Sequence, residues 1–308
     1  MTYRIFLFCL LTISVGTSQD PPTVYRDLDY VGMKNPRQTL DLYLPAATSE
    51  SPRPLIVFVH GGAWRLGSKA GGGRRLQRFL DSGNYVGASI NYRLTPEALW
   101  PAQIHDCRAA IRWLRGNAEM YGIDPKRIAV WGTSAGGHLV AMLGTSHGVE
   151  GLEGDLGEYD AESSAVQAVV NFFGPANLAT MGDHPSTMDH NAPNSPESLL
   201  IGGPVQDTLS KAAEASPETH ATPDDSPMLI VHGTEDELVP YPQSVEFEKA
   251  LEKAGVPVSF LTVEKGGHGR GFGPDVDAVV ERFLANQLLG EGPLPEDQTV
   301  PAVLLRRP

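Results

Sequence analysis

Residues 128–145 read IAVWGTSAGGHLVAMLGT, and this stretch decides the fold. Residues 127–131 predict a strand, and residues 138–145 predict a helix that follows it almost at once. Ser134 therefore lies in a Gly-x-Ser-x-Gly turn, residues 132–136, where a strand passes directly into a helix. Such a turn lifts the serine hydroxyl above the edge of a sheet, and its two glycines remove Cβ atoms that would clash there. The stretch predicts a nucleophilic serine.

The rest of the chain alternates strand and helix patterns around this turn. Such alternation predicts right-handed βαβ units and one α/β domain, in which helices flank a mostly parallel central sheet. Further strands are expected over residues 24–31, 39–44, 55–59, 85–91, 165–172, 228–231 and 258–263, and further helices over 74–82, 103–121, 244–254 and 276–288.

Two segments interrupt the alternation. Residues 175–227, called the insert below, have no strong period and lie between the sixth and seventh predicted strands. A loop of this length inside a compact domain is usually functional, so we expect a small cap that binds substrate. Residues 150–162 are acidic and are interpreted either as a solvated turn or as a calcium site, although their spacing does not match an EF-hand. Residues 290–308 are assigned as a C-terminal tail.

Charge and length limit the possible partners. The 308 residues carry a formal net charge of −13. An acidic chain repels phosphate backbones and anionic membranes, which argues against nucleic acid and a membrane surface as partners. The acidity is otherwise typical of a soluble secreted protein.

The N-terminus has the pattern of a signal peptide. Arg4 precedes a short apolar run over residues 5–15, and the small residues Gly16 and Ser18 suit cleavage after position 18. We therefore expect a signal peptide over 1–18, a mature domain over 19–289, and a secreted or periplasmic protein without a stable membrane anchor. An N-terminal anchor or a buried strand is the alternative. Cleavage would leave Cys107, in an apolar helical stretch, as a core residue.

A serine hydroxyl needs a base, and the base needs an orienting acid. With this type of turn the chain order is serine, acid, histidine. His268 follows the strand 258–263 within a glycine-rich loop, and Asp236 follows the strand 228–231. These two are predicted as base and orienter of Ser134. His232 comes too early in the chain to be the base.

The oxyanion of an acyl-transfer reaction needs two or more backbone N–H donors. The residue after the nucleophile, Ala135, is expected to supply one. Gly62 and Ala63, in the loop after the strand 55–59, are expected to supply the others. Trp64 and His60 of the same loop are predicted to contact substrate. No cofactor or metal is needed for this chemistry.

Five motifs together resemble one known family. They look like the esterase and lipase branch of the α/β-hydrolases related to hormone-sensitive lipase, and most like secreted bacterial acetylxylan and feruloyl esterases of the BD-FAE type. Many relatives have a third glycine where this chain has Ala63. The resemblance covers about residues 24–289 and implies that residues 198–203 belong to a wall of the substrate site. The motifs are HGGAW at 60–64, NYRL at 91–94, DPKRI at 124–128, GTSAGGH at 132–138 and HGTED at 232–236.

The resemblance implies a serine carboxylic-ester hydrolase that acts through an acyl-enzyme. The expected substrate carries short-chain or aryl esters, with acetyl or feruloyl groups of plant polysaccharide as the first choice. Alternatives are an amide hydrolase of the formamidase or peptidase type, a lipase-like or polyester-hydrolysing esterase, and a catalytically silent binding protein. The acyl group, the alcohol and the oligomeric state stay open at this point.

Overall fold

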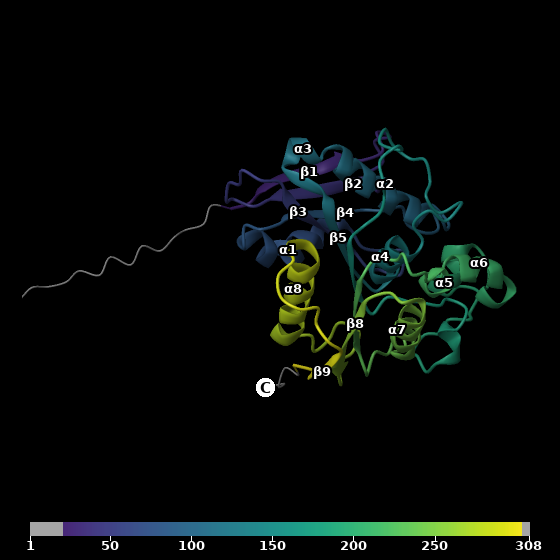
Figure 1. Ribbon diagram of the computed structural model, residues 1–308. Helices are drawn as coiled ribbons and strands as arrows, with labels where there is room; N and C mark the ends of the chain where they lie inside the picture. The colour runs from purple at the N-terminus through teal and green to yellow at the C-terminus, as the bar shows by residue number, and fades with distance from the viewer. Residues whose placement is uncertain (1–20, 304–308) are drawn as a thin grey trace, which may run out of the picture.

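The computed structural model describes residues 21–303, so the predicted signal peptide at 1–18 lies outside the described residues. Nine strands form one sheet in the order β1-β2-β4-β3-β5-β6-β7-β8-β9 (Figure 1). β2 pairs antiparallel with β1 and β4, and all other neighbours are parallel. The predicted α/β fold with a mostly parallel sheet is confirmed. The strands are β1 (Thr23–Asp29), β2 (Thr39–Leu44), β3 (Arg53–Val59), β4 (Val86–Ile90), β5 (Ile123–Thr133), β6 (Ala168–Phe172), β7 (Met228–Gly233), β8 (Val258–Glu264) and β9 (Gln298–Pro301).

Helices cover both faces of the sheet, so the central strands are buried on both sides and read as continuous apolar runs. Alternate residues of β3 show this. Val57 packs in the cluster that includes residues of α2, α4 and α7, and Phe58 packs in the cluster with residues of α1 and α8. These helices are α1 (Gly72–Asp81), α2 (Ala102–Gly116), α4 (Ala135–Thr145), α7 (Pro242–Ala254) and α8 (Pro274–Leu289).

The helix expected over 103–121 is two helices. α2 ends at Gly116, and the short α3 (Ala118–Tyr121) follows. Asn117 separates them, and its side-chain amide donates to the Trp113 carbonyl oxygen at 2.9 Å. An asparagine that bonds its own backbone in this way competes with helix continuation.

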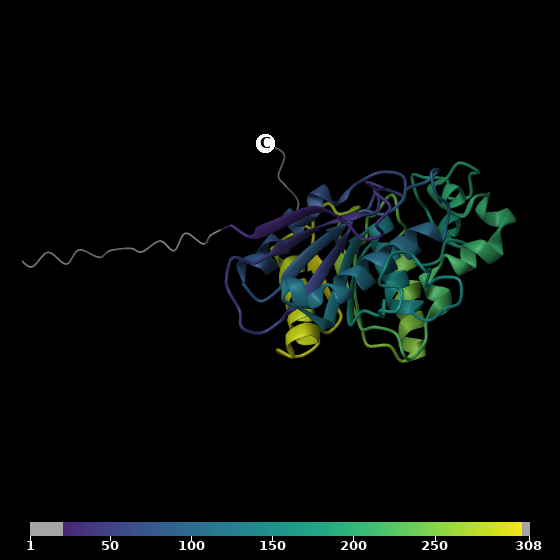
Figure 2. The same cartoon turned by 90° about the horizontal axis from the view of Figure 1, so that it is seen from above.

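The insert lies between β6 and β7 and contains the short helices α5 (Pro196–Ile201) and α6 (Leu209–Glu214). Figures 1 and 2 show α5 and α6 together at one end of the molecule, away from β1 and β9. At six residues each, these helices are too short to give a period in the sequence. Their signals are local, since Ser195 caps α5 through a bond from the Ser198 N–H and Gly202 ends it in the left-handed conformation.

The sheet continues into the segment predicted as a C-terminal tail. β9 pairs parallel with β8, so the boundary at residue 289 falls short of the last strand. The Asp297 side chain accepts from the Phe260 N–H at 2.8 Å just before the strand begins. Four residues that include Pro301 give little strand signal, and proline is tolerated here because β9 lies at the sheet edge.

Two features outside the site follow from burial and charge. Cys107 is fully buried, as predicted for a core residue. In the acidic loop, Glu153 lies 3.2 Å from the buried Arg108 guanidinium and accepts from the Ser164 hydroxyl at 2.7 Å.

Among residues 21–303 no group of three or more His, Cys, Asp or Glu is placed to hold a metal ion. In the same range no helix has the length and apolar character needed to span a membrane.

Candidate active site

Ser134 lies at the junction of β5 and α4, on the strand–turn–helix that residues 128–145 predict. Its φ of 56° is in the left-handed region, which costs a serine conformational energy. The Ser134 N–H donates to the Phe172 carbonyl at 2.9 Å and helps to hold this backbone. A Cβ at Gly132 would overlap the Gly136 carbonyl, and one at Gly136 would overlap the Val59 carbonyl. Only glycine fits at either position.

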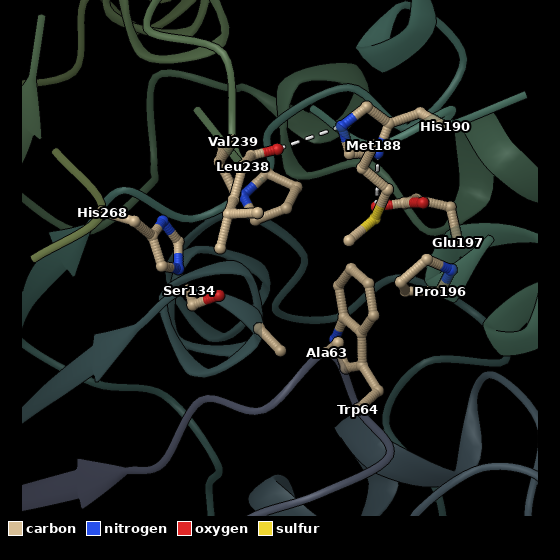
Figure 3. A pocket seen from close by; sticks show the side chains of 12 residues that line it. Ala63, Trp64, Ser134, Met188, His190, Pro196, Glu197, Leu238, Val239 and His268 are labelled. Atoms are coloured by element: carbon tan, nitrogen blue, oxygen red, sulfur yellow. Dashed lines mark hydrogen bonds and ion pairs between the residues drawn. The ribbon is translucent and has the colours of Figure 1, made fainter. Parts of the chain in front are cut away.

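His268 and Asp236 meet as the sequence predicts. Nδ1 of His268 lies 2.8 Å from Oδ2 of Asp236, which follows the end of β7. Because a carboxylate only accepts, Nδ1 carries the proton and Nε2 is left to accept one. Figure 3 shows the His268 ring directly beside Ser134. The three side chains thus stand in the order serine, histidine, aspartate.

The Asp236 carboxylate is buried and fully engaged. Its Oδ1 accepts from the backbone N–H groups of Leu238 and Val239 at 2.9 and 3.0 Å. Burial alone would raise the pKa of Asp236, but hydrogen bonds and charge from His232 and His268 hold it well below its ordinary value. Asp236 is therefore ionised across the neutral range and fixes the His268 ring.

His232 is a second histidine at Asp236, and the sequence reasoning assigned it no role. Its Nε2 lies 3.3 Å from Oδ2 of Asp236 and 3.0 Å from the Val239 carbonyl oxygen. Its Nδ1 lies 2.7 Å from the Ser244 hydroxyl. A carbonyl only accepts, so Nε2 carries a proton and supports the carboxylate from behind. In the sequence, the i, i+4 spacing of His232 and Asp236 is the signal that could have pointed to this contact.

The loop after β3 brings a backbone turn to the site. Gly62, Ala63 and Trp64 have φ values of 119°, 53° and 55°. The Gly62 carbonyl closes the turn by accepting from the N–H groups of Arg65 and Leu66 at 3.0 and 2.9 Å. Ala63, like Ala135 next to Ser134, lines the pocket, whereas Gly62 is not among the lining residues.

Trp64 forms one wall of the pocket and is held from behind by His138. The indole N–H donates to Nδ1 of His138 at 3.1 Å, and Nε2 of His138 donates to the Ala215 carbonyl at 2.6 Å. Burial lowers the pKa of His138 to about 4, so its ring is neutral and serves as a fixed connector. Trp64 therefore links β3, α4 and the insert.

The structure does not place His60, which was expected to contact substrate, among the residues that line the pocket. His60 is buried and stacks on Tyr92, with ring centroids 4.4 Å apart. Its Nδ1 lies 2.7 Å from the Gly61 carbonyl oxygen, and it does not line the pocket. Burial lowers the pKa of His60 to about 4. The chain turns after β3, so the His60 side chain packs in the interior beneath the loop that contains Gly62 and Ala63.

The insert closes the pocket with residues that the sequence did not single out. The cavity has a volume of about 370 Å³, part of it open to solvent, and its apolar wall includes Met188 and Pro196 of the insert and Leu238 of the loop after β7 (Figure 3). Residues 198–203, expected to form a wall, lie just beyond it, because Leu200 and Ile201 pack into the core instead. The lining residues are Ala63, Trp64, Ser134, Ala135, Pro175, Met188, His190, Pro196, Glu197, Leu238, Val239 and His268.

His190 and Glu197 form a buried ion pair in the insert wall. Nδ1 of His190 lies 3.1 Å from Oε1 of Glu197, and both side chains are 3% exposed. Nε2 of His190 lies 3.0 Å from the Leu238 carbonyl oxygen and 3.1 Å from the Ser186 hydroxyl. Burial alone would lower the pKa of His190, but the Glu197 carboxylate raises it above its ordinary value.

Comparison with known proteins identifies the family of this chain. The sequence model of the BD-FAE family matches residues 40–251, more than half of the chain. The chain belongs to the BD-FAE family. This confirms the resemblance that the sequence motifs predict. A second model, described as TAP-like protein, matches residues 207–300.

BD-FAE membership is consistent with the curated relatives. Esterase LipC of Mycobacterium tuberculosis is 32% identical over 76% of this chain and 57% of its own length. Isoprenylcysteine alpha-carbonyl methylesterase ICME of Arabidopsis thaliana is 30% identical over 73% of this chain and 52% of its own length. The chain thus spans about half the length of the curated relatives it matches.

Solved structures resemble the BD-FAE chain over nearly its whole described length. A truncated form of a carbohydrate esterase from gut microbiota has a TM-score of 0.80 and 34% identity, covering 87% of this chain and 96% of its own. A bifunctional GH43-CE protein of Bacteroides eggerthii has the same TM-score and identity over 86% of this chain and 35% of its own. A butyrate-bound esterase of Thermogutta terrifontis has a TM-score of 0.70 and 28% identity, covering 88% and 96%.

Proposed function

We propose that this protein is a serine carboxylic-ester hydrolase in which Ser134, His268 and Asp236 form the catalytic triad. The observation that carries the proposal is the 2.8 Å bond between His268 and Asp236, made beside a serine held at φ 56° in a pocket. A serine hydroxyl is activated when a positioned imidazole accepts its proton and a carboxylate holds that imidazole in the right tautomer. In this chain His268 supplies the imidazole and Asp236 supplies the carboxylate.

In the proposed reaction Oγ of Ser134 attacks the ester carbonyl carbon, and its proton moves to Nε2 of His268. The oxyanion is stabilised by backbone N–H groups of Ala63 and Ala135, which both line the pocket, with Gly62 as a further donor. The tetrahedral intermediate collapses, the C–O bond to the alcohol breaks, and His268 returns the proton to the leaving oxygen. Water then attacks the acyl-enzyme, with His268 again as base, and releases the acid.

We infer acetyl or feruloyl groups on plant polysaccharide as the substrate class. Membership of the BD-FAE family supports this, as do the two structural neighbours that are described as a carbohydrate esterase and a GH43-CE protein. Secretion to the cell exterior or the periplasm is part of the proposal, and it rests on the signal-peptide pattern of residues 1–18.

The test is hydrolysis of p-nitrophenyl acetate by the purified protein and by its Ser134→Ala variant. We expect measurable turnover that falls to the uncatalysed background in the variant, with an unchanged melting temperature. Activity that survives the substitution would overturn the proposal. A second panel of acetylxylan, methyl ferulate, a triglyceride and N-formylkynurenine separates polysaccharide esterase, lipase and formamidase activities. The highest kcat/KM is expected on acetylxylan or methyl ferulate.

A further inference from the structure

The pocket has two polar regions separated by apolar surface. One contains Ser134 and His268, and the other contains His190 and Glu197 (Figure 3). Between them lie the side chains of Met188 and other apolar lining residues. A binding pocket that is mostly apolar with a few convergent polar groups fixes the orientation of its ligand through those groups.

One oxygen of Glu197 is unused. Oε1 faces His190, whereas Oε2 is buried and has no hydrogen-bond partner among residues 21–303. Glu197 itself is only 3% exposed. Leaving a buried carboxylate oxygen without a donor is costly, and native structures seldom do so without a reason. Glu197 lines the pocket, so a ligand that displaces the side chains covering Oε2 and brings a donor to this oxygen would remove the cost.

The charge of the pair decides which donor fits. Nε2 of His190 faces the Leu238 carbonyl oxygen, and Nδ1 lies 3.1 Å from the Glu197 carboxylate without an aligned hydrogen bond among residues 21–303, so the two side chains attract each other as charges when His190 is protonated. The imidazolium and the carboxylate then cancel, and the pair offers no net charge to attract an ammonium group. A neutral donor such as a hydroxyl therefore suits Oε2, because the imidazolium of His190 already balances the negative charge of the Glu197 carboxylate.

We propose that Oε2 of Glu197 accepts a hydrogen bond from a hydroxyl group of the ester substrate and so selects hydroxylated esters. His190 is a positioning residue, which holds the carboxylate through Oε1 and is itself held by Leu238 and Ser186. The proposal rests on the proposed esterase function, because it assumes that an ester occupies this pocket. The hydroxyl has two possible sources, a sugar ring in the alcohol part and a phenol in the acyl part.

The test compares kcat/KM within two pairs of esters that differ by one hydroxyl. Methyl p-coumarate and methyl cinnamate probe the acyl part, and methyl 2-O-acetyl-xyloside and its 3-deoxy analogue probe the alcohol part. We expect the wild type to prefer the hydroxylated member of one pair by about tenfold or more, since a hydrogen bond to a charged group is worth that much. The preferred pair identifies the source of the hydroxyl.

Glu197→Met removes the acceptor while keeping side-chain length, and the preference should fall to about one. If that variant does not fold, Glu197→Gln serves instead, and its weaker neutral acceptor should reduce the preference several-fold. Glu218→Met is the matched control, because Glu218 also has a buried, unpartnered oxygen but lies outside the pocket lining. Its preference should equal that of the wild type.

Two results would overturn the inference. One is a wild-type preference near one in both pairs, and the other is a preference that survives in both folded Glu197 variants. If Glu197 only tied the insert together, both members of a pair would lose rate equally and the preference would survive. Turnover of p-nitrophenyl acetate, which has no hydroxyl, reports on the esterase proposal separately. Its absence in the wild type would contradict that proposal rather than this one.

Discussion

The two walls of the pocket are held in place by different kinds of contact. In the sheet wall, Ser134 and Ala135 lie on backbone fixed by the end of β5, the bond to Phe172 and glycines that admit no Cβ. In the insert wall, His190 and Glu197 depend on one ion pair and on hydrogen bonds to a neighbouring loop. In the proposed reaction the sheet wall holds the reacting atoms, and the insert wall selects which substrate groups can lie against them.

The two walls meet at the loop that follows β7. Thr187 of the insert donates both its N–H and its hydroxyl to the Glu237 carbonyl, at 2.9 and 2.8 Å. Glu237 is next to Asp236, the acid of the proposed triad. The contrast therefore predicts that damage to the sheet wall removes catalysis, and that damage to the insert wall changes selectivity, stability or pH dependence.

The largest effect is expected from His268→Ala. Removing the base should lower kcat by about 10⁶-fold, as when a triad histidine is lost from a serine hydrolase. The rate of p-nitrophenyl acetate hydrolysis by the wild type and the variant measures this loss of kcat. His147→Ala is the control, because His147 is exposed and lies away from the pocket. A His268 variant with near wild-type kcat would mean that the sheet wall does not hold the base.

A smaller but still large loss is expected from Asp236→Asn. The amide would offer an N–H where His268 needs an acceptor, so the ring would adopt the wrong tautomer and kcat should fall by about 10⁴-fold. Steady-state kinetics on the same ester measure the fall. Glu237→Gln, at the exposed neighbouring position, should keep its rate. Equal rates in the two variants would show that Asp236 does not contribute to catalysis.

Trp64→Phe tests the connection between the walls. The substitution removes the indole donor and leaves the buried Nδ1 of His138 without a partner. Trp131→Phe is a matched control, because Trp131 is equally buried and its indole nitrogen has no partner within residues 21–303. In urea denaturation the Trp64 variant should lose about 1–3 kcal/mol more than the control. Equal losses would show that the bond to His138 contributes nothing.

The smallest effect concerns the pH dependence of the insert wall. The pKa of His190 is raised in the folded state, so its contribution to stability is present below the unfolded value of 6.5 and is lost as pH rises through the folded value. The free-energy difference between the wild type and His190→Asn should therefore be larger at about pH 6 than at about pH 9. Chemical denaturation at both values measures it. A difference that grows toward high pH would contradict the ion pair.

Sequence reasoning reached the sheet wall because its signals are local. Ser134 lies between a predicted strand and helix, and Asp236 and His268 follow strands whose carboxyl ends meet at one sheet edge. The stacking of His60 on Tyr92 was not predictable, because a strand-ending pattern does not say which way a side chain points after the chain turns.

The same local patterns could not predict the insert wall. Met188, His190 and Glu197 come together through tertiary contacts among short turns and a six-residue helix, which leave no period in the sequence. β9 was missed for a related reason, since four residues gain their strand conformation from pairing with β8.

The most direct test of the central claim is covalent labelling with a fluorophosphonate, followed by peptide mass spectrometry. The reagent reacts with an activated serine, so one adduct per chain is expected on the peptide that contains Ser134, with esterase activity lost in proportion. The Ser134→Ala variant should take up no label. An adduct on another residue, or full activity after complete labelling of Ser134, would contradict the account.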